Sequence, residues 1–262
     1  NFIKPFFIQF KELLSKVPRI HLLNSQLINS PYTNMAYKSK NVYLSSSTIN
    51  SEDVLYSWAS DGGRSCVDCQ KVENSELCYE CIDIERCYNV SYLVKCRDCV
   101  DSQFLFDCAS CKNCFLSSNL RNKEYVFKNV QCSREEYLKK VEEYLKGSHK
   151  LREKAFDEFL SLTRNSLHRF ANIIKSLNSS GDNIHNAKNA QKSFDVYDVE
   201  DIKYAFRCVG EKDSMDIMGA GPGSNHTYEG ISTGIDGSMQ RFCAFTWESV
   251  FDLDYCWNVH NG

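Results

Sequence analysis

A short pattern recurs along the first half of the chain, in which a small apolar residue is followed three positions later by a second small residue. Early copies lie twelve residues apart and later copies lie nine apart. The copies begin at Val42, Val54, Cys66, Cys78, Cys87, Cys96, Leu105 and Cys114. Self-similarity at a short, fixed period is typical of repeat architectures, in which each unit buries its apolar face against its neighbours.

This spacing predicts a mainly β fold with a helical insert, namely a β-solenoid of short 9–12-residue repeats whose step shortens from twelve to nine at Cys78–Cys87. Equivalent positions of such a fold stack at about 4.8 Å. Small side chains suit a narrow interior, and free Cys is among the most frequently buried residue types. Asp, Asn, Ser and Glu lie between the copies, as tight corners require.

A helical segment interrupts the repeat. Ser133 and Glu136 have the spacing of a capping box, and Gly147 is a suitable C-terminal stop for the helix that they begin. Ser148 can cap a second helix, and a third apolar series runs from Leu167 to Leu177. We therefore predict a helical hairpin or a three-helix segment.

These signals divide the chain into four segments. Residues 1–40 form an N-terminal helix over 6–16 and an Asn/Ser-rich loop over 24–40, and residues 41–132 form the cysteine-rich repeats. Residues 133–180 are the helical insert, and residues 181–262 are a second, truncated solenoid segment. Because the chain opens without Met and stops without a capping repeat, we expect the gene product to be longer.

Composition narrows the class of protein. Hydrophobic residues make up 42% of the chain, which excludes a disordered segment, and the net charge of −3 provides no basic field for nucleic acid. Neither a signal peptide nor an apolar run of about 18 residues is present, so we expect no membrane association. We expect the fourteen cysteines to be reduced thiols or metal ligands in a cytoplasmic, reducing compartment.

Two cysteine quartets share the spacing C-x2-C-x8-C-x2-C. The first comprises Cys66, Cys69, Cys78 and Cys81, and the second comprises Cys96, Cys99, Cys108 and Cys111. Four thiolates in two close pairs can hold a tetrahedral structural zinc ion. However, Val42 and Ser45 occupy equivalent positions and cannot ligate zinc, and the spacer is shorter than in most zinc sites. Two interpretations stay open, a ladder of buried thiols, which we favour, and bound zinc.

The residues provide no convergent catalytic or cofactor-binding set. A catalytic Cys needs a basic partner, and no histidine lies inside the cysteine-rich block. The histidines are His21, His149, His168, His185, His226 and His260. The glycine-rich stretch 219–223 lacks the Lys-Ser/Thr of a phosphate loop. We read the aromatic residues Tyr79, Tyr88, Phe104 and Phe106 as exposed residues that pair across repeats.

We therefore predict a non-enzymatic scaffold or interaction module that binds an unknown protein partner or associates with itself. The alternative is a zinc-stabilised binding module that contacts nucleic acid through a segment outside this sequence. The third hypothesis is that the protein is an enzyme, which would require a pocket in which Cys and His side chains lie together.

Several stretches resemble a family of uncharacterised cysteine-rich repeat proteins of Patescibacteria (the candidate phyla radiation). They are residues 6–13, 77–87, 119–125, 133–137 and 181–195. The resemblance implies further segments at both ends, including a zinc-ribbon-like stretch upstream. Relatives often carry Cys where this chain has Val90, Val199 and Ile202, an exchange that suits a packed ladder better than metal ligation. The resemblance to this family implies an architecture and no activity.

Overall fold

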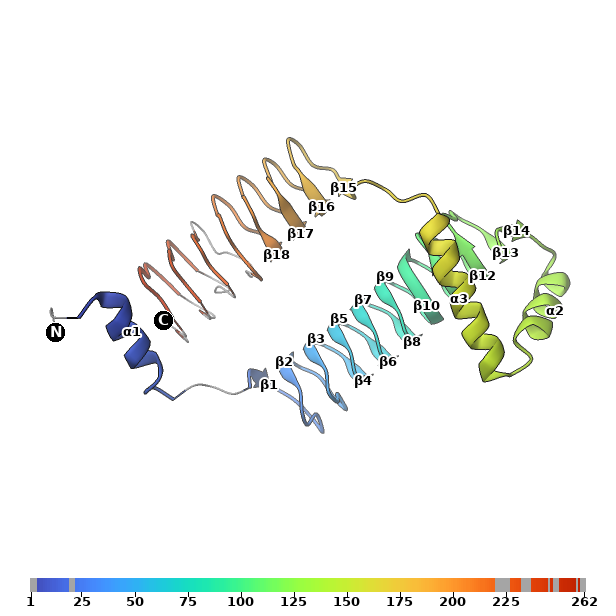
Figure 1. The fold of residues 1–262 in the computed structure, drawn as a ribbon, viewed down its shortest axis with the longest axis horizontal. Coiled ribbons are helices and arrows are strands. Elements are labelled where there is room, and N and C mark those ends of the chain that lie inside the picture. Colours follow the sequence, from blue (N-terminus) through green and yellow to red (C-terminus); the bar gives the residue numbers. More distant parts are fainter. Residues whose placement is uncertain are drawn as a thin grey trace. The chain divides into compact units, whose positions relative to one another are not determined.

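The computed structural model describes residues 4–18, 22–219, 227–231, 237–244, 246, 250–257 and 259. The chain forms two compact units, residues 1–167 and residues 168–262. Both units are mainly β, and helices interrupt the strands in the middle of the chain, as the sequence predicted (Figure 1).

Parallel pairing at a constant offset of twelve residues organises the first unit. Ser46 pairs with Trp58, Trp58 with Gln70, and Gln70 with Ile82. We call each set of twelve residues a turn of the chain. The strands are β1 (Asn24–Ser25), β2 (Asn34–Tyr37), β3 (Ser46–Ile49), β4 (Glu52–Leu55), β5 (Trp58–Asp61), β6 (Arg64–Val67), β7 (Gln70–Glu73), β8 (Glu76–Tyr79), β9 (Ile82–Glu85), β10 (Tyr88–Arg97), β11 (Val100–Phe106), β12 (Lys112–Ser118), β13 (Glu124–Phe127) and β14 (Val130–Gln131).

Within each turn the local repeat is only three residues long. One residue in three points inward and is buried, as Cys66, Cys69, Val72 and Ser75 are in one turn. The residue before each inward position has a positive φ, which places a corner of the chain there; Asp68 is one example at 54°. Asn and Asp tolerate this left-handed conformation better than most residues, which explains their frequency between the copies.

The predicted shortening of the step to nine residues is wrong. Cys87 and Cys96 are three inward positions apart along the chain and belong to different columns. The residue stacked on Cys96 is Ile84, and the pairing of Tyr88 with Val100 shows that the offset of twelve continues through this region. Every third residue is inward, so a step of nine and a step of twelve both lead from one inward residue to another. Only the step of twelve leads to the residue that is stacked on it in the next turn.

The inward side chains connect successive turns. The hydroxyl of Ser57 donates a hydrogen bond to the carbonyl of Leu55 (2.9 Å) and accepts one from the backbone amide of Cys69, twelve residues on (3.1 Å). Thiols occupy the same place, because Cys66 donates to the carbonyl of Arg64 (3.3 Å). The amide of Leu93 likewise faces the sulfur of Cys81, twelve residues before it.

The hydroxyl arrangement recurs along both units. In each case the hydroxyl of an inward serine accepts a hydrogen bond from the backbone amide of the residue twelve positions later. The serine and the amide residue are Ser39 and Ser51, Ser45 and Ser57, Ser75 and Cys87, Ser102 and Cys114, and Ser193 and Ala205. A buried amide without an acceptor costs free energy comparable to a lost hydrogen bond. Inward Ser and Cys side chains supply such acceptors, whereas inward residues such as Val54 and Val90 supply apolar packing alone.

The predicted loop over 24–40 is in fact part of the stack. Asn24 pairs with Ala36 and Asn34 with Ser46 in the same parallel register. Its Asn and Ser residues have the roles seen further on, since Asn29 adopts a positive φ of 45° and Ser39 is a buried inward residue. The polar residues of this segment occupy corners and inward positions of the stack. The prediction of a loop took their polarity as a sign of irregular structure.

The helices follow their predicted start signals in part. Helix α1 spans Phe6–Leu14, α2 spans Arg134–Leu145 and α3 spans His149–Asn165. The Ser133 hydroxyl accepts a hydrogen bond from the amide of Glu136 (3.2 Å), as a capping box requires. Among the residues that the structure describes, no helix combines the length and apolar content needed to cross a bilayer.

The third apolar series is not helical, so the three-helix alternative is wrong. It contains the short strand β15 (Ile173–Ile174), which begins the second unit's sheet, and Leu177 bridges to Lys188. The same sheet continues through β16 (Gly181–His185), β17 (Ser193–Tyr197) and β18 (Phe206–Val209). Apolar residues at a period of three resemble a helical stripe, which explains the error.

The second unit has the same offset over most of its length. Val196 pairs with Ile184 and with Cys208, and all three are buried. The period loosens beyond residue 210 as predicted, because Met215 bridges to Tyr228 at an offset of thirteen. Most of the glycine-rich stretch 219–223 lies outside the described residues.

A single substitution tests the inward hydrogen bonds. Replacing Ser57 with Ala leaves the Cys69 amide without its acceptor, so we expect the free energy of unfolding to fall by about 1–3 kcal/mol. Ser57→Cys should retain most of the stability, and Ser91→Ala, at a half-exposed outward position, should change it by less than about 0.5 kcal/mol. Urea unfolding followed by circular dichroism measures all three, and equal stabilities would contradict the account.

Candidate functional site

Two outward ladders of side chains flank an open groove on the first unit. One ladder consists of the positive-φ residues Tyr32, Leu44, Tyr56 and Asp68, and the other consists of Asn34, Ser46, Trp58 and Gln70. The inward column Thr33, Ser45, Ser57 and Cys69 forms the floor, and Leu22 and Ile82 complete the lining. We call this feature the axial groove, because it follows the direction in which the turns stack.

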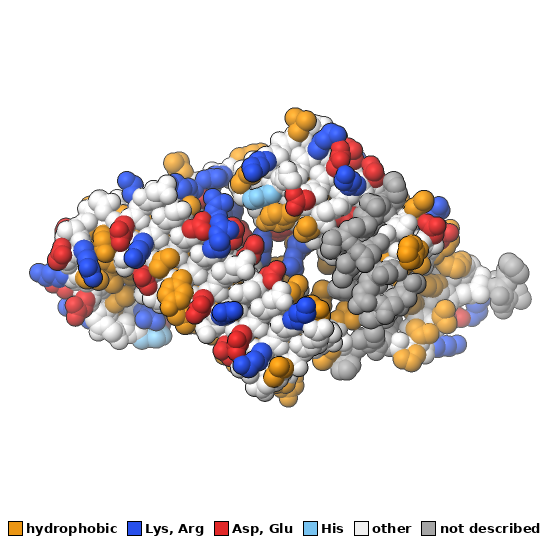
Figure 2. All heavy atoms as spheres, turned by 180° about the vertical axis from the view of Figure 1, so that it is seen from behind, with side chains coloured by type: hydrophobic (Ala, Val, Ile, Leu, Met, Phe, Trp, Pro, Cys, Tyr) orange, Lys and Arg blue, Asp and Glu red, His pale blue; other side chains and the backbone are white. Residues whose placement is uncertain are grey.

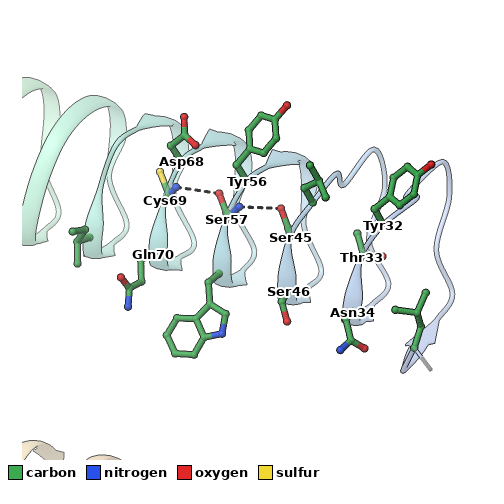
Figure 3. A pocket seen from close by; sticks show the side chains of 14 residues that line it. Tyr32, Thr33, Asn34, Ser45, Ser46, Tyr56, Ser57, Asp68, Cys69 and Gln70 are labelled. Atoms are coloured by element: carbon green, nitrogen blue, oxygen red, sulfur yellow. Dashed lines mark hydrogen bonds between the residues drawn. The ribbon is translucent and has the colours of Figure 1, made fainter. Parts of the chain in front are cut away.

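Figure 3 shows the two ladders on opposite sides of the floor. The side chains of Tyr32, Tyr56 and Asp68 point one way, and those of Asn34, Ser46 and Gln70 point the other (Figure 3). The hydrogen bonds from the Ser57 amide to the Ser45 hydroxyl (3.0 Å) and from the Cys69 amide to the Ser57 hydroxyl fix the spacing of the floor. These bonds join the backbones of successive turns, so the two ladders have the same spacing as the core.

Large apolar side chains of the first ladder are exposed in this part of the groove. Tyr32 is 71% exposed, and Leu44 and Tyr56 are each 51% exposed. Tyr43 lies between the two tyrosines, with its ring centroid 5.8 Å from each in edge-to-face geometry. Aromatic and aliphatic groups held in this way on a rigid scaffold are typical anchors of a binding surface.

The same ladders continue further along the stack, where helix α3 covers them. Counting on by twelve from Asp68 reaches Glu80 and then Tyr92, Phe104 and Leu116, all at positive φ. Phe104 is fully buried and Leu116 is 4% exposed. Phe106 of the second ladder, 4% exposed, belongs to the same apolar cluster, together with Ala155 and Phe159 of α3. Beyond the open groove, the same two ladders are therefore covered by a helix.

The match between α3 and the ladder follows from their dimensions. The ring of Phe156 lies 5.5 Å from Tyr92, and the ring of Phe159 lies 5.9 Å from Phe104. Three residues of α-helix rise about 4.5 Å, close to the strand spacing of about 4.8 Å. Residues at i and i+3 of a helix can therefore meet rings on successive turns. Lys128, at the next ladder position, forms an ion pair with Glu158 of α3 (2.6 Å).

The cysteines of the predicted quartets are inward and belong to stacked columns. Cys66 lies directly under Cys78 in the strand register, and Val54 and Val90 occupy the same column. The described residues contain no group of three or more His, Cys, Asp or Glu arranged to hold a metal ion. That geometry does not test metal content, so zinc at these eight cysteines stays a prediction.

Contacts among the thiols and burial keep several of them protonated. The hydrogen bond with the Cys66 thiol, followed by burial, raises the pKa of Cys78 well above its ordinary value. In the second unit burial, followed by the nearby Glu211 carboxylate, raises the pKa of the Cys208 thiol to about 12. The hydrogen bond from the Cys78 thiol in turn lowers the pKa of Cys66, so the two stacked thiols shift in opposite directions.

None of the histidines that the structure describes is among the residues that line the groove. His149 begins α3 and lies 3.7 Å from Glu153, and His168 and His185 belong to the second unit. His185 contacts Asn183 (3.2 Å) and stacks near the ring of Tyr197. The remaining three, His21, His226 and His260, fall outside the described residues.

Charges of both signs are interspersed on the surface. On the face drawn in Figure 2, basic and acidic side chains alternate and do not form a patch of one sign. Many of them pair across turns, as Lys40 does with Glu52 (2.6 Å) and Arg86 with Asp98 (2.7 Å). Asp68 is the one charged residue among the described residues that line the groove.

The sequence prediction of exposed aromatics was half right. Tyr79 and Tyr88 are exposed, whereas Phe104 and Phe106 are buried under α3. Sequence reasoning also missed the groove, although a signal was present, since Tyr92, Phe104 and Leu116 recur at the twelve-residue step ahead of an amphipathic helix. No protein-family model matches the chain, and no curated protein matches it.

The buried thiol of Cys208 makes stability depend on pH. An unfolded cysteine ionises near pH 8.5, whereas the folded pKa is about 12, so the folded state retains a proton that the unfolded state loses. Below about pH 8.5 the thiol is protonated in both states and does not reduce the free energy of unfolding. Between about pH 8.5 and the folded pKa, its ionisation in the unfolded state lowers that free energy by about 1.4 kcal/mol per pH unit. Urea unfolding at pH 8, 9 and 10 should show a smaller decline for Cys208→Val than for the parent chain, and parallel declines would contradict the assignment.

Proposed function

We propose that this chain is a β-solenoid that acts as a non-enzymatic interaction module and binds a protein partner in the axial groove. One observation carries the proposal: a single pair of ladders is filled by a helix at one end and open at the other. Leu44 and Phe104 occupy the same ladder sixty residues apart, which is five turns, yet Leu44 is 51% exposed and Phe104 is fully buried.

The lining of the open part supports binding. Tyr and Trp are enriched at protein interfaces, and here they lie beside small hydroxyl and amide side chains that can form hydrogen bonds. The hydrogen-bonded floor holds both ladders in place, so binding would cost little ordering of the scaffold. A partner would gain contacts on a surface that is already formed.

The same lining argues against catalysis in the groove. The hydroxyls of Ser45 and Ser57 are engaged with backbone groups on both sides, and the Cys69 thiol donates to the carbonyl of Val67 (3.2 Å). Among the described residues that line the groove, none is a His, Lys or Arg that could activate them. A nucleophile with an adjacent base, which acyl transfer requires, is not among these residues.

Site-specific photo-crosslinking in cells tests the proposal. Benzoylphenylalanine in place of Tyr56 puts the reactive group in the groove, and the same residue in place of the exposed Tyr88 puts it on a different ladder. We expect a discrete cross-linked protein with the Tyr56 probe, and we expect Leu44→Asn in the same chain to abolish it. Cross-links of equal yield and identity from both positions would contradict a specific groove.

A second candidate, a zinc-stabilised module, is favoured by the stacking of the Cys66–Cys69 and Cys78–Cys81 thiols in consecutive turns. We expect elemental analysis of protein purified without chelator to find far less than one zinc per chain, because these thiols donate hydrogen bonds to carbonyl oxygens. Stoichiometric zinc that Cys78→Ser removes would establish the second candidate instead.

A further inference from the structure

We propose that the open part of the axial groove binds an amphipathic α-helix of a partner protein, an inference that rests on the groove's proposed function and names the class of partner. This helix has a Lys or Arg at the position where α3 has Glu158. The covered part of the ladders, five turns further along the stack, shows how a helix packs against them.

The open and covered parts of the first ladder have the same order of apolar and charged side chains. The order is Tyr32, Leu44, Tyr56 and Asp68 in the open part, and Tyr92, Phe104, Leu116 and Lys128 in the covered part. Each residue of one set lies sixty positions from its counterpart in the other, and all of them have a positive φ. Three apolar positions are thus followed by a charged one in both parts, and the sign of that charge is reversed.

Helix α3 contacts all four positions of the covered part. Aromatic rings of α3 lie 5.5 Å and 5.9 Å from the rings of the first two residues, Tyr92 and Phe104. The third, Leu116, is buried in the same apolar cluster. The charged residue, Lys128, forms an ion pair with Glu158 of α3 (2.6 Å). The open part repeats this series of positions on a surface that continues the α3 interface.

The reversed charge decides which helix suits the open part. The Asp68 side chain projects on the same side as those of Tyr32 and Tyr56 (Figure 3). A helix like α3 in the corresponding position would bring Glu158 towards Asp68, and the two carboxylates would repel each other. Among the described lining residues there is no basic side chain to neutralise Asp68. A helix with Lys or Arg at that position would instead form an ion pair there.

The backbone of the groove favours a helix over an added β-strand. The amides of Asn34, Ser46 and Trp58 already donate to carbonyl groups of the next turn, at 3.0–3.2 Å. The floor hydroxyls of Ser45 and Ser57 accept amides in the same way. An extended peptide binds chiefly through hydrogen bonds to an open strand edge, whereas a helix satisfies its own backbone and binds through side chains. The exposed ladder side chains suit the second mode.

Peptide binding tests the role of charge. Two fluorescent peptides have the sequence of α3, residues 149–165, and are held helical by a hydrocarbon staple on the exposed face. One retains Glu158 and the other carries Glu158→Lys. In fluorescence anisotropy with the whole chain at low salt, we expect the Glu158→Lys peptide to bind roughly fivefold more tightly, because a repulsion becomes an attraction. Equal affinities, or tighter binding of the parent peptide, would overturn the inference.

Variants of the protein locate the binding. Asp68→Lys places Lys at a φ of 54°, close to the 49° of Lys128, and we expect it to reverse the preference between the two peptides. Leu44→Asn removes an apolar side chain of the groove, and Leu77→Asn makes the same change on another ladder. We expect Leu44→Asn to weaken binding of the Glu158→Lys peptide roughly tenfold and Leu77→Asn to leave it unchanged. An unreversed preference, or equal effects of the two asparagine variants, would contradict binding in the groove.

A second pair of peptides tests the helical conformation. Asp157 is exposed on α3, so Asp157→Pro and Asp157→Ala remove the same charge from the unstapled Glu158→Lys sequence, and only proline breaks the helix. We expect the proline peptide to bind roughly tenfold more weakly than the alanine peptide, because proline costs about 3 kcal/mol in a helix interior. Equal binding would show that the groove accepts an extended chain, which would overturn the inference.

Failure of this inference and failure of the proposed function give different results. If the Tyr56 probe captures a protein in cells but neither α3-derived peptide binds, the groove remains a binding site and the helix assignment is wrong. If the probe captures nothing and neither peptide binds, both are wrong.

Discussion

The structure depends on one hydrogen-bonding arrangement, in which a small inward side chain accepts the amide of the residue twelve positions on and donates to the carbonyl two positions back. At Ser57 both bonds are near 3 Å. Where the inward residue is Ser, its hydroxyl accepts the amide twelve residues on, whereas inward residues such as Val54 and Leu93 have no acceptor and contribute apolar packing instead. Serine provides a strong acceptor, and cysteine provides a weaker one with more apolar surface. Packing and hydrogen bonding thus account for the inward, buried position of most of the cysteines.

The constant offset of twelve residues also determines how the outward side chains are arranged. Because the inward columns hold a constant offset, every outward position also becomes a straight ladder with a step of about 4.8 Å. A ladder can then be apolar over part of its length and polar over the rest, as the one from Tyr32 to Lys128 is. Helix α3 covers one apolar stretch of it, and the other is exposed. The proposed binding site is the part of this regular surface that no helix covers.

Particular residues show how much the sequence could predict. The Cys66–Cys69 and Cys78–Cys81 pairs do stack at twelve residues, and Ser133 does cap α2. The three-residue corner was missed, since its left-handed positions hold residues as different as Asn29, Leu77 and Phe104, and no single residue type identifies them. That omission produced the false nine-residue step and the false third helix. The groove could not be predicted either, because it requires knowing that Phe104 and Leu44 share a ladder and that α3 lies over only one of them.

The constant register is the claim on which both the core and the groove depend, and backbone nuclear Overhauser effects test it most directly. In ¹⁵N-labelled, deuterated protein, the account predicts contacts between the amides of residues in adjacent turns at an offset close to twelve, such as those around Tyr88 and Val100, continuing from Asn24 to Phe127. Contacts centred on an offset of nine after Cys87, for example between the backbone amides of Cys87 and Cys96, would contradict it.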